Sequence, residues 1–200
     1  MMQSKRIIGL TGATGSGKGE VCRILKEKGA VIIDTDSLSH DVILAGRPAY
    51  HEILAAFGTG ILDEKRQISR KHLGNIVFAS KPKLKKLSRI VHKYVVEECK
   101  KLIENTSSGI IVIDAPLLIE AGIQNMCCMV VGVFAPENIR LERIINRDNI
   151  SRADAELRMA SQMPARILRA YVHASIENNG TLDALKEQVL HLWPKIQGKD

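Results

Sequence analysis

A glycine-rich run near the N-terminus constrains the fold of this chain more than any other feature of its sequence. Residues 12–19 read Gly-Ala-Thr-Gly-Ser-Gly-Lys-Gly. A short apolar segment, 6–10, precedes the run, and apolar residues at helical spacing follow it at Val21, Ile24 and Leu25. A glycine loop between a buried strand and a helix is typical of a phosphate-binding P-loop. The alternative is a glycine-rich turn that binds no ligand.

The P-loop pattern is complete except at its last position. Glycines let backbone N–H groups surround a polyphosphate, and Lys18 can reach the β- and γ-phosphates. A hydroxyl residue that binds Mg²⁺ normally follows the lysine, but Gly19 stands there. Glu20 could assist the metal, or it could simply favour the positive end of the helix dipole. The sequence therefore predicts a phosphate cradle without its usual metal ligand.

Charge and hydropathy narrow the classes of partner. A net charge of +7 favours acidic partners such as nucleotides, nucleic acid or a membrane surface. The basic cluster within 81–89 reads more readily as a solvated helix face than as a nucleic-acid site, since only 4% of residues are aromatic. No segment approaches the roughly 18 apolar residues of a membrane span. We expect a cytoplasmic protein that binds neither nucleic acid nor membrane.

The cysteines and histidines predict neither disulfides nor a zinc site. The four cysteines form no C-x-x-C pair, and the six histidines have no metal-ligand spacing. Cys127 and Cys128 are expected within a buried apolar run. The cysteines are therefore interpreted as small core residues in a reducing compartment.

Strand-like and helical segments alternate along the chain, which predicts a parallel sheet covered by helices. After the first strand, further strands are expected at 30–33, 109–113, 129–134 and 174–176. Helical patterns occupy 37–57, 70–79, 84–104, 136–147 and 151–163, and a last helix follows Gly180 with Thr181 as its N-cap. The fold predicted is α/β, a P-loop NTPase-type three-layer sandwich with a central parallel sheet and two helical excursions.

Acidic residues follow two of the predicted strands, where ligands of such sheets bind. Asp34 and Asp36 end the second strand, and both carboxylates would share a side if that strand continued. Asp36 could accept a proton or hold Mg²⁺, but it could equally cap the next helix. Asp114 ends the third strand, either as a metal-organising acid or as a turn former.

Arginines concentrate after the fourth strand. Arg140, Arg143 and Arg147 fall on one helical face, and Arg152 and Arg158 follow. Arginines on a mobile helical pair can close over ATP and neutralise charge during phosphoryl transfer. A solvated face explains some of them equally well.

Segments spread over nearly the whole chain follow the order and spacing of one family. They are 8–12, 31–36, 69–70, Leu73, 77–78, His92, 116–120, Arg143, 147–148, Gln162 and 176–180. With these segments the chain resembles the dephospho-coenzyme A kinase family; related nucleoside monophosphate kinases lack the Asp-Thr-Asp and Pro-Leu-Leu-Ile-Glu segments at these places. The pattern departs at Gly19, at Lys93, where proline is usual, and at 172–173, where Ala-Asp is usual.

The resemblance implies transfer of the γ-phosphoryl group of ATP to the ribose 3′-hydroxyl of dephospho-CoA, with ATP and Mg²⁺ as cofactors and no obligate protein partner. It implies that Asp36 is the catalytic base and that Lys18 and Arg143 stabilise the transferred charge. The implied ATP-binding residues are Gly12, Ala13, Thr14, Gly15, Ser16, Gly17, Lys18, Gly19, Glu20 and Arg147. The implied substrate-binding residues are Asp34, Asp36, Arg70, His92, Leu117 and Glu120.

The same resemblance implies a division of the chain. Residues 1–36, 108–139 and 174–200 would form the P-loop core, 37–107 a helical CoA-substrate domain, and 140–173 a helical lid. Two other functions stay open at this point. One is a kinase for another nucleotide-like acceptor; the other is a nucleotide- or CoA-binding module impaired in catalysis, which Gly19 motivates.

Overall fold

Two compact units make up the structure, a computed structural model that describes residues 5–199. One unit combines the chain up to Ile33 with the chain from Thr106 onward, and the other is Asp34–Asn105. The first unit contains a five-stranded sheet in the order β2-β3-β1-β4-β5. Its strands are β1 (Arg6–Thr11), β2 (Val31–Asp34), β3 (Ile110–Asp114), β4 (Met129–Phe134) and β5 (Ala174–Glu177).

Parallel pairing places the ends of the strands together. β1 pairs in parallel with β3 and with β4, so Leu10 lies opposite Asp114 on one side and Val131 on the other. β4 pairs in parallel with β5, with Phe134 opposite Glu177. These pairings confirm the predicted α/β class. Because the carboxyl ends of parallel strands meet at one edge, the loop after β1 and the residues after β3, β4 and β5 meet there.

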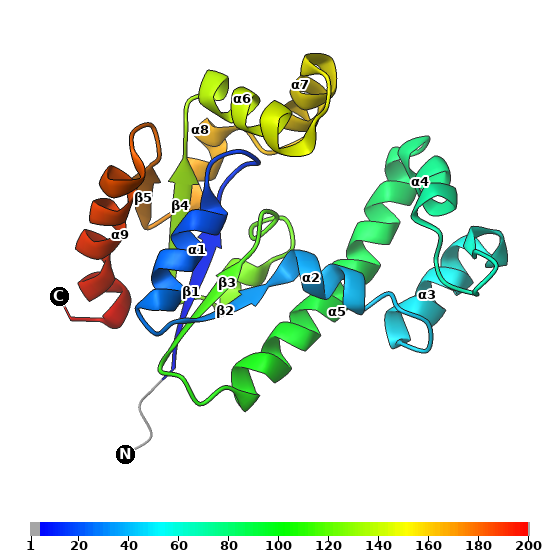
Figure 1. Cartoon of the computed structure of the whole chain (residues 1–200). Helices are drawn as coiled ribbons and strands as arrows, with labels where there is room; N and C mark the ends of the chain where they lie inside the picture. Colours follow the sequence, from blue (N-terminus) through cyan, green and yellow to red (C-terminus); the bar gives the residue numbers. More distant parts are fainter. Residues whose placement is uncertain (1–4, 200) are drawn as a thin grey trace. The chain divides into compact units, whose positions relative to one another are not determined.

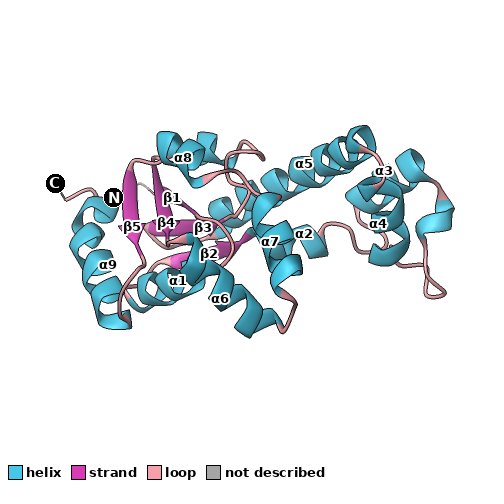
Figure 2. Cartoon of the chain, turned by 90° about the horizontal axis from the view of Figure 1, so that it is seen from above, coloured by secondary structure: helices cyan, strands magenta, loops and turns pink. Residues whose placement is uncertain are grey.

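Two helices cover one face of the sheet, α1 (Lys18–Glu27) and α9 (Leu182–Gln197) (Figure 2). Their apolar faces pack against Ile8 and Leu10 of β1 in one continuous core. Gly9, between these two, faces the opposite side, where a Cβ atom would come within 2.8 Å of the Leu118 side chain and force it to shift. That side also holds the 3₁₀ turn η2 (Ile123–Met126). Thr181 accepts a hydrogen bond from the N–H of Ala184, which confirms the predicted N-cap of α9.

A helical segment stands at the carboxyl end of β4 (Figure 1). It consists of α6 (Glu137–Asp148), α7 (Arg152–Ala160), α8 (Ala165–Leu168) and the 3₁₀ turn η3 (Arg169–Tyr171). Asn149 ends α6 in the left-handed conformation, and Ser151 caps α7 by accepting from the N–H of Asp154. The helix predicted over 151–163 is shorter than expected: α7 ends at Ala160, four residues before Pro164, and the proline itself disfavours helix only at Met163.

The second unit is helical. Its elements are α2 (Thr35–Asp41), α3 (Pro48–Phe57), the 3₁₀ turn η1 (Thr59–Ile61), α4 (Arg70–Phe78) and α5 (Lys81–Asn105). Ile53, Ile61, Leu73, Val77 and Ile90 form its core. The single helix predicted over 37–57 is wrong. Helix α2 ends at Asp41, turns that include Gly46 with a φ of 84° follow, and α3 begins with Pro48 in its first turn.

Side-chain exposure bears on two further expectations, one for the basic cluster within 81–89 and one for the cysteines. The basic residues Lys81, Lys83, Lys85, Lys86 and Arg89 are all exposed, as expected for a solvated helix face.

The expectation that Cys127 and Cys128 lie in a buried run is wrong, because Cys127 is half-buried and Cys128 is exposed; Cys99 alone among the described cysteines is buried. Both cysteines lie between the turn η2 and β4, so they precede the buried strand, which begins at Met129. Within 5–199, no helix has the length and apolar character that crossing a membrane requires.

Candidate active site

The glycine loop connects β1 to α1 in a conformation that side chains disfavour. Gly15 and Gly17 have φ values of 80° and 95°. A Cβ atom at Gly15 would meet the backbone of Arg140, and one at Gly17 would meet the side-chain amide of Asn178. The loop therefore lies tightly against α6 and against the residue after β5, and both glycines are needed for steric reasons.

The N-terminus of α1 is open to an anion. Gly17 is its N-cap residue and has no side chain that could accept a hydrogen bond from the first turn. The hydroxyl of Ser16 is buried and has no partner within the described chain. First-turn N–H groups carry positive potential and need acceptors, which phosphate oxygens supply. The loop thus fits the phosphates of a nucleotide in both shape and charge.

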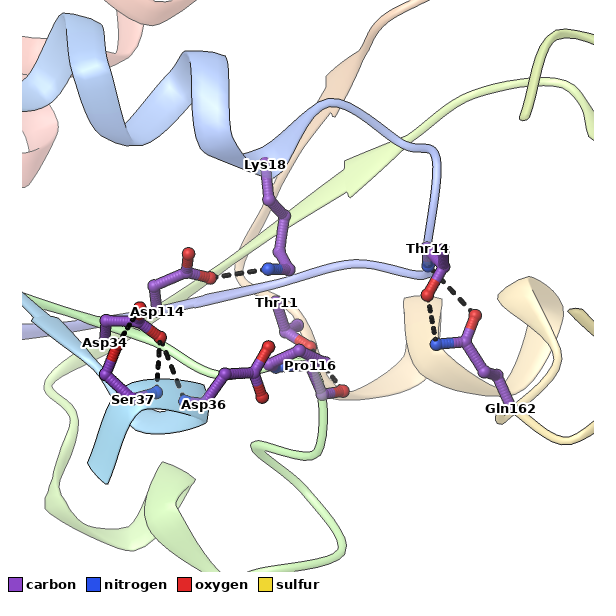
Figure 3. A network of polar contacts seen from close by, with 9 residues as sticks. All are labelled: Thr11, Thr14, Lys18, Asp34, Asp36, Ser37, Asp114, Pro116 and Gln162. Carbon is purple, nitrogen blue, oxygen red and sulfur yellow. Dashed lines mark hydrogen bonds and ion pairs between the residues drawn. The ribbon is translucent and has the colours of Figure 1, made fainter. Parts of the chain in front are cut away.

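Lys18 and Asp114 form an ion pair at the carboxyl edge of the sheet (Figure 3). The distance from Lys18 Nζ to Asp114 Oδ1 is 2.6 Å, and the two side chains are only 14% and 17% exposed. Parallel pairing explains the contact, because Asp114 ends β3 beside β1, which leads into the loop. Nearby, the Thr11 hydroxyl donates to the carbonyl of Pro116 at 3.5 Å. Of the two sequence interpretations of Asp114, this placement favours an acid that belongs to the phosphate site.

Side chains from outside the loop bind its carbonyl groups in succession. Arg140 Nε donates to the carbonyl of Thr14 at 2.9 Å, and Arg143 Nη1 donates to that of Gly15 at 3.3 Å. Asn178 Nδ2 donates to the carbonyl of Ser16 at 2.8 Å. Arg140 is only 7% exposed, and its burial lowers the pKa of its guanidinium. These three side chains fix the peptide planes of the loop, and the two arginines also bring positive charge to it.

Gln162, in the turn between α7 and α8, makes a reciprocal contact with the loop. Its Oε1 accepts from the N–H of Thr14, and its Nε2 donates to the Thr14 hydroxyl, both at 2.9 Å (Figure 3). A cavity of about 520 Å³ lies beside this turn and is lined by Arg140, Gln162 and Arg166 among others. This volume is in the range of small-molecule sites.

Residues 19 and 20 were expected to bear on the metal. A Cβ atom at Gly19 would meet no described atom within 4 Å, so the missing side chain leaves open space. The Glu20 carboxylate accepts from Arg23 Nε at 3.0 Å, and this bond lowers the pKa of Glu20. No cluster of three or more His, Cys, Asp or Glu ligands occurs between residues 5 and 199. Asp114 is therefore the acid that this unit places beside the phosphate loop.

In the other unit, Asp34 rather than Asp36 caps the helix. Asp34 Oδ1 accepts from the N–H of Asp36 at 2.9 Å and from the N–H of Ser37 at 3.4 Å, and Oδ2 accepts from the Ser37 hydroxyl at 2.8 Å (Figure 3). The interpretation of Asp36 as the cap is wrong, as is the idea of a strand continuing through both acids. Strand β2 stops at Asp34, and Asp36 is exposed in the first turn of α2.

Arg70 and His92, also expected to bind substrate, lie on different helices of the same unit. Arg70 follows the N-cap Ser69 of α4, and its guanidinium contacts the His40 ring on α2. His92 is half-buried in the middle of α5. The structure brings Arg70 to α2, the helix that carries Asp36.

The remaining expected residues belong to the first unit. Leu117 and Glu120 are exposed in the segment after β3 and line a small cavity with Ala13 and Gln162. Arg147 differs from Arg143, because its Nε donates to Asp148 at 2.7 Å and its side chain is 60% exposed. The Arg147 guanidinium lowers the pKa of Asp148, and Arg158 also pairs with that carboxylate.

The expected ATP-binding residues omitted three side chains that contact the loop: Arg140, Gln162 and Asn178. Arg140 was one of several clustered arginines, and the other two were only positions of a family pattern. For Asn178 a usable signal exists, since a polar residue directly after a buried parallel strand falls at the ligand edge of the sheet.

Comparisons with known proteins agree with this geometry. The family model described as dephospho-CoA kinase matches residues 6–184. The dephospho-CoA kinase of Carboxydothermus hydrogenoformans is 42% identical over 97% of this chain and 96% of its own length. That of Moorella thermoacetica is 41% identical over 96% of this chain and 92% of its own length.

A solved structure supports the fold. The dephospho-CoA kinase from Campylobacter jejuni has a TM-score of 0.69 and 23% identity, covering 97% of this chain and 98% of that one. At this identity the likeness concerns the fold alone, whereas the sequence matches over nearly the full length establish the relationship. The chain belongs to the dephospho-CoA kinase family.

Proposed function

We propose that this chain transfers the γ-phosphoryl group of ATP to the ribose 3′-hydroxyl of dephospho-CoA, which yields CoA and ADP. The observation that carries the proposal is the family match over residues 6–184. The phosphate loop supports it independently, because it combines an uncapped helix N-terminus with a cationic side chain and flanking arginines.

On the ATP side, the chain supplies electrostatic stabilisation. The N–H groups of the loop and of the first turn of α1 hold the phosphates. Lys18, held in place by Asp114, stabilises the negative charge that spreads over the transferred group. Arg143 approaches the same loop from α6 and adds positive charge. Arg147 is assigned to nucleotide binding as part of the lid, residues 140–173. To bind the nucleotide, its guanidinium would have to leave its ion pair with Asp148.

Mg²⁺ fits this site with few ligands from the protein. The cation, when bound with ATP, would neutralise negative charge on the phosphates. Asp114 is the carboxylate that would hold it, through water while its ion pair with Lys18 persists, because Asp114 lies beside the loop and Gly19 has no side-chain oxygen. Most of its coordination would then come from phosphate and water oxygens.

On the acceptor side, Asp36 is proposed as the general base that takes the proton of the 3′-hydroxyl. A carboxylate in this role needs an accessible position and a fixed backbone, and Asp36 is exposed in a turn that Asp34 caps. The compact unit Asp34–Asn105 supports the assignment of 37–107 as the domain that binds dephospho-CoA, with Arg70 and His92 among its contacts.

The test is CoA formation from ATP and dephospho-CoA by the wild-type chain and by Asp36→Asn. Loss of the base should lower kcat by about a hundredfold or more while ATP affinity stays unchanged. Asp41→Asn is the matched control, since Asp41 is exposed on the same helix. If Asp36→Asn kept normal turnover, Asp36 would not be the base. If the wild-type chain bound both nucleotides without turnover, it would be a binding module; if another acceptor outperformed dephospho-CoA, the acceptor assignment would be wrong.

A further inference from the structure

Asn178 is a buried polar residue at the ligand edge of the sheet. It directly follows β5 and is 6% exposed. Its backbone N–H donates to the carbonyl of Phe134 at 2.7 Å, which continues the pairing of β5 with β4. The backbone of Asn178 is therefore anchored to the sheet, and its side chain projects from a rigid base.

The side chain of Asn178 joins the phosphate loop to α6. Its Nδ2 donates to the carbonyl of Ser16 at 2.8 Å, and its Oδ1 accepts from Arg143 Nη2 at 3.5 Å. The chemistry of these partners determines the orientation of the amide, because a carbonyl can only accept and a guanidinium can only donate. A substitution at Asn178 can therefore remove the donor to Ser16 or the acceptor for Arg143 separately.

The bond to Ser16 controls the direction of a loop N–H group. In a planar trans peptide, the C=O of one residue and the N–H of the next point in opposite directions. Holding the Ser16 carbonyl toward Asn178 therefore aims the Gly17 N–H away from Asn178. Gly17 has a φ of 95°, and a Cβ atom there would collide with the Asn178 amide. The Asn178 amide can thus take this position only because residue 17 is a glycine.

We propose that Asn178 is a positioning residue for ATP binding: it fixes the peptide between Ser16 and Gly17 so that the Gly17 N–H points at a nucleotide phosphate, and it orients Arg143 beside the same loop. This inference rests on the proposed function, in that the phosphates belong to ATP. An N–H group already aimed at its ligand needs no reorientation on binding, so its contribution to affinity is not reduced by the cost of ordering the loop.

The experiment measures ATP affinity by calorimetry, without the acceptor, in Asn178→Ala, Asn178→Asp and Asn179→Ala. Asn179 is the matched control, because it is the same residue type at the next position and is exposed. Losing the buried hydrogen bond should weaken ATP binding about tenfold in Asn178→Ala. Asn178→Asp keeps the shape and an acceptor for Arg143 but cannot donate to Ser16, so we expect at least the same loss. Asn179→Ala should stay within about twofold of wild type.

Two further readouts separate positioning from general stability. The KM for dephospho-CoA should not change in the Asn178 variants, and the amide resonance of Gly17 should shift less on ATP addition than in the wild-type protein. If Asn178→Ala fails to fold, the ATP affinity of the isosteric variant Asn178→Asp tests the inference instead. The inference is overturned if either folded variant binds ATP as tightly as wild type, or if the Gly17 resonance responds normally. A wild-type protein that binds ATP but forms no CoA would contradict the proposed function while leaving this comparison of ATP affinities valid.

Discussion

Restoring a hydroxyl at position 19 tests what the unusual phosphate loop lacks. Gly19 is the second residue of α1, and a Cβ atom placed there meets no described atom within 4 Å. Gly19→Ser therefore introduces its side chain without a clash. We expect it to lower the Mg²⁺ concentration that half-saturates ATP-dependent turnover, because the new oxygen can replace one metal-bound water.

The substitution has two expected effects, one on Mg²⁺ binding and one on the stability of the helix. One neutral oxygen ligand should contribute about 1 kcal/mol, comparable to a net hydrogen bond, which corresponds to about a fivefold lower half-saturating Mg²⁺ concentration. Replacing glycine in a helix also stabilises the fold, by up to about 1 kcal/mol with alanine and by less with serine. Gly19→Ala separates the two effects, because alanine adds the same Cβ atom without an oxygen.

The assay titrates Mg²⁺ at saturating ATP and dephospho-CoA and measures ADP release in the wild-type protein and both variants. Thermal unfolding in parallel should show a gain for both variants, larger for alanine than for serine. A shared shift of Mg²⁺ dependence in Gly19→Ser and Gly19→Ala would refute the reasoning, because the hydroxyl would then play no part. An unchanged Mg²⁺ dependence in both would show that the metal is held without any residue at this position.

Three other predictions concern buried or partly buried groups. Asp114→Asn should lower the free energy of unfolding by about 1–2 kcal/mol, because Lys18 loses an ionised partner in a site that is only 14% and 17% exposed. Urea denaturation measures this, and an unchanged midpoint would mean that the pair contributes no stability. Burial raises the pKa of the Cys99 thiol from 9.0 to about 11, so Cys99 should react with a thiol reagent only on unfolding, whereas the exposed Cys128 reacts at once. Because the folded-state pKa is the higher one, the stability contributed by this neutral thiol is complete below pH 9.0 and is lost as the pH rises toward about 11. The free energies of unfolding of wild type and Cys99→Ala, measured against pH, should therefore diverge in that window. Parallel curves would contradict a raised pKa for Cys99.

The sequence predicted the parts of the fold that depend on local pattern. The buried strands β1, β3, β4 and β5 were recognised as apolar runs, and the glycine loop between β1 and α1 was recognised from its spacing. Local pattern was less reliable at breaks. The predicted helix over 37–57 missed the break between Asp41 and Pro48. Asp34 rather than Asp36 is the cap, because the helix begins two residues earlier than predicted, at Thr35.

For the site, the sequence by itself determined the chemistry of the phosphate loop: the glycines, Lys18 and the missing hydroxyl at Gly19 lie within eight consecutive residues. Only the tertiary structure decided what holds that loop. Asp114, Arg140, Gln162 and Asn178 reach it from more than ninety residues away in the chain. The register of parallel strands and the packing of α6 bring these side chains together. Such contacts leave no periodic signal in a sequence, because hydrogen bonds between distant segments depend on where strands end and not on which residues are neighbours in the chain.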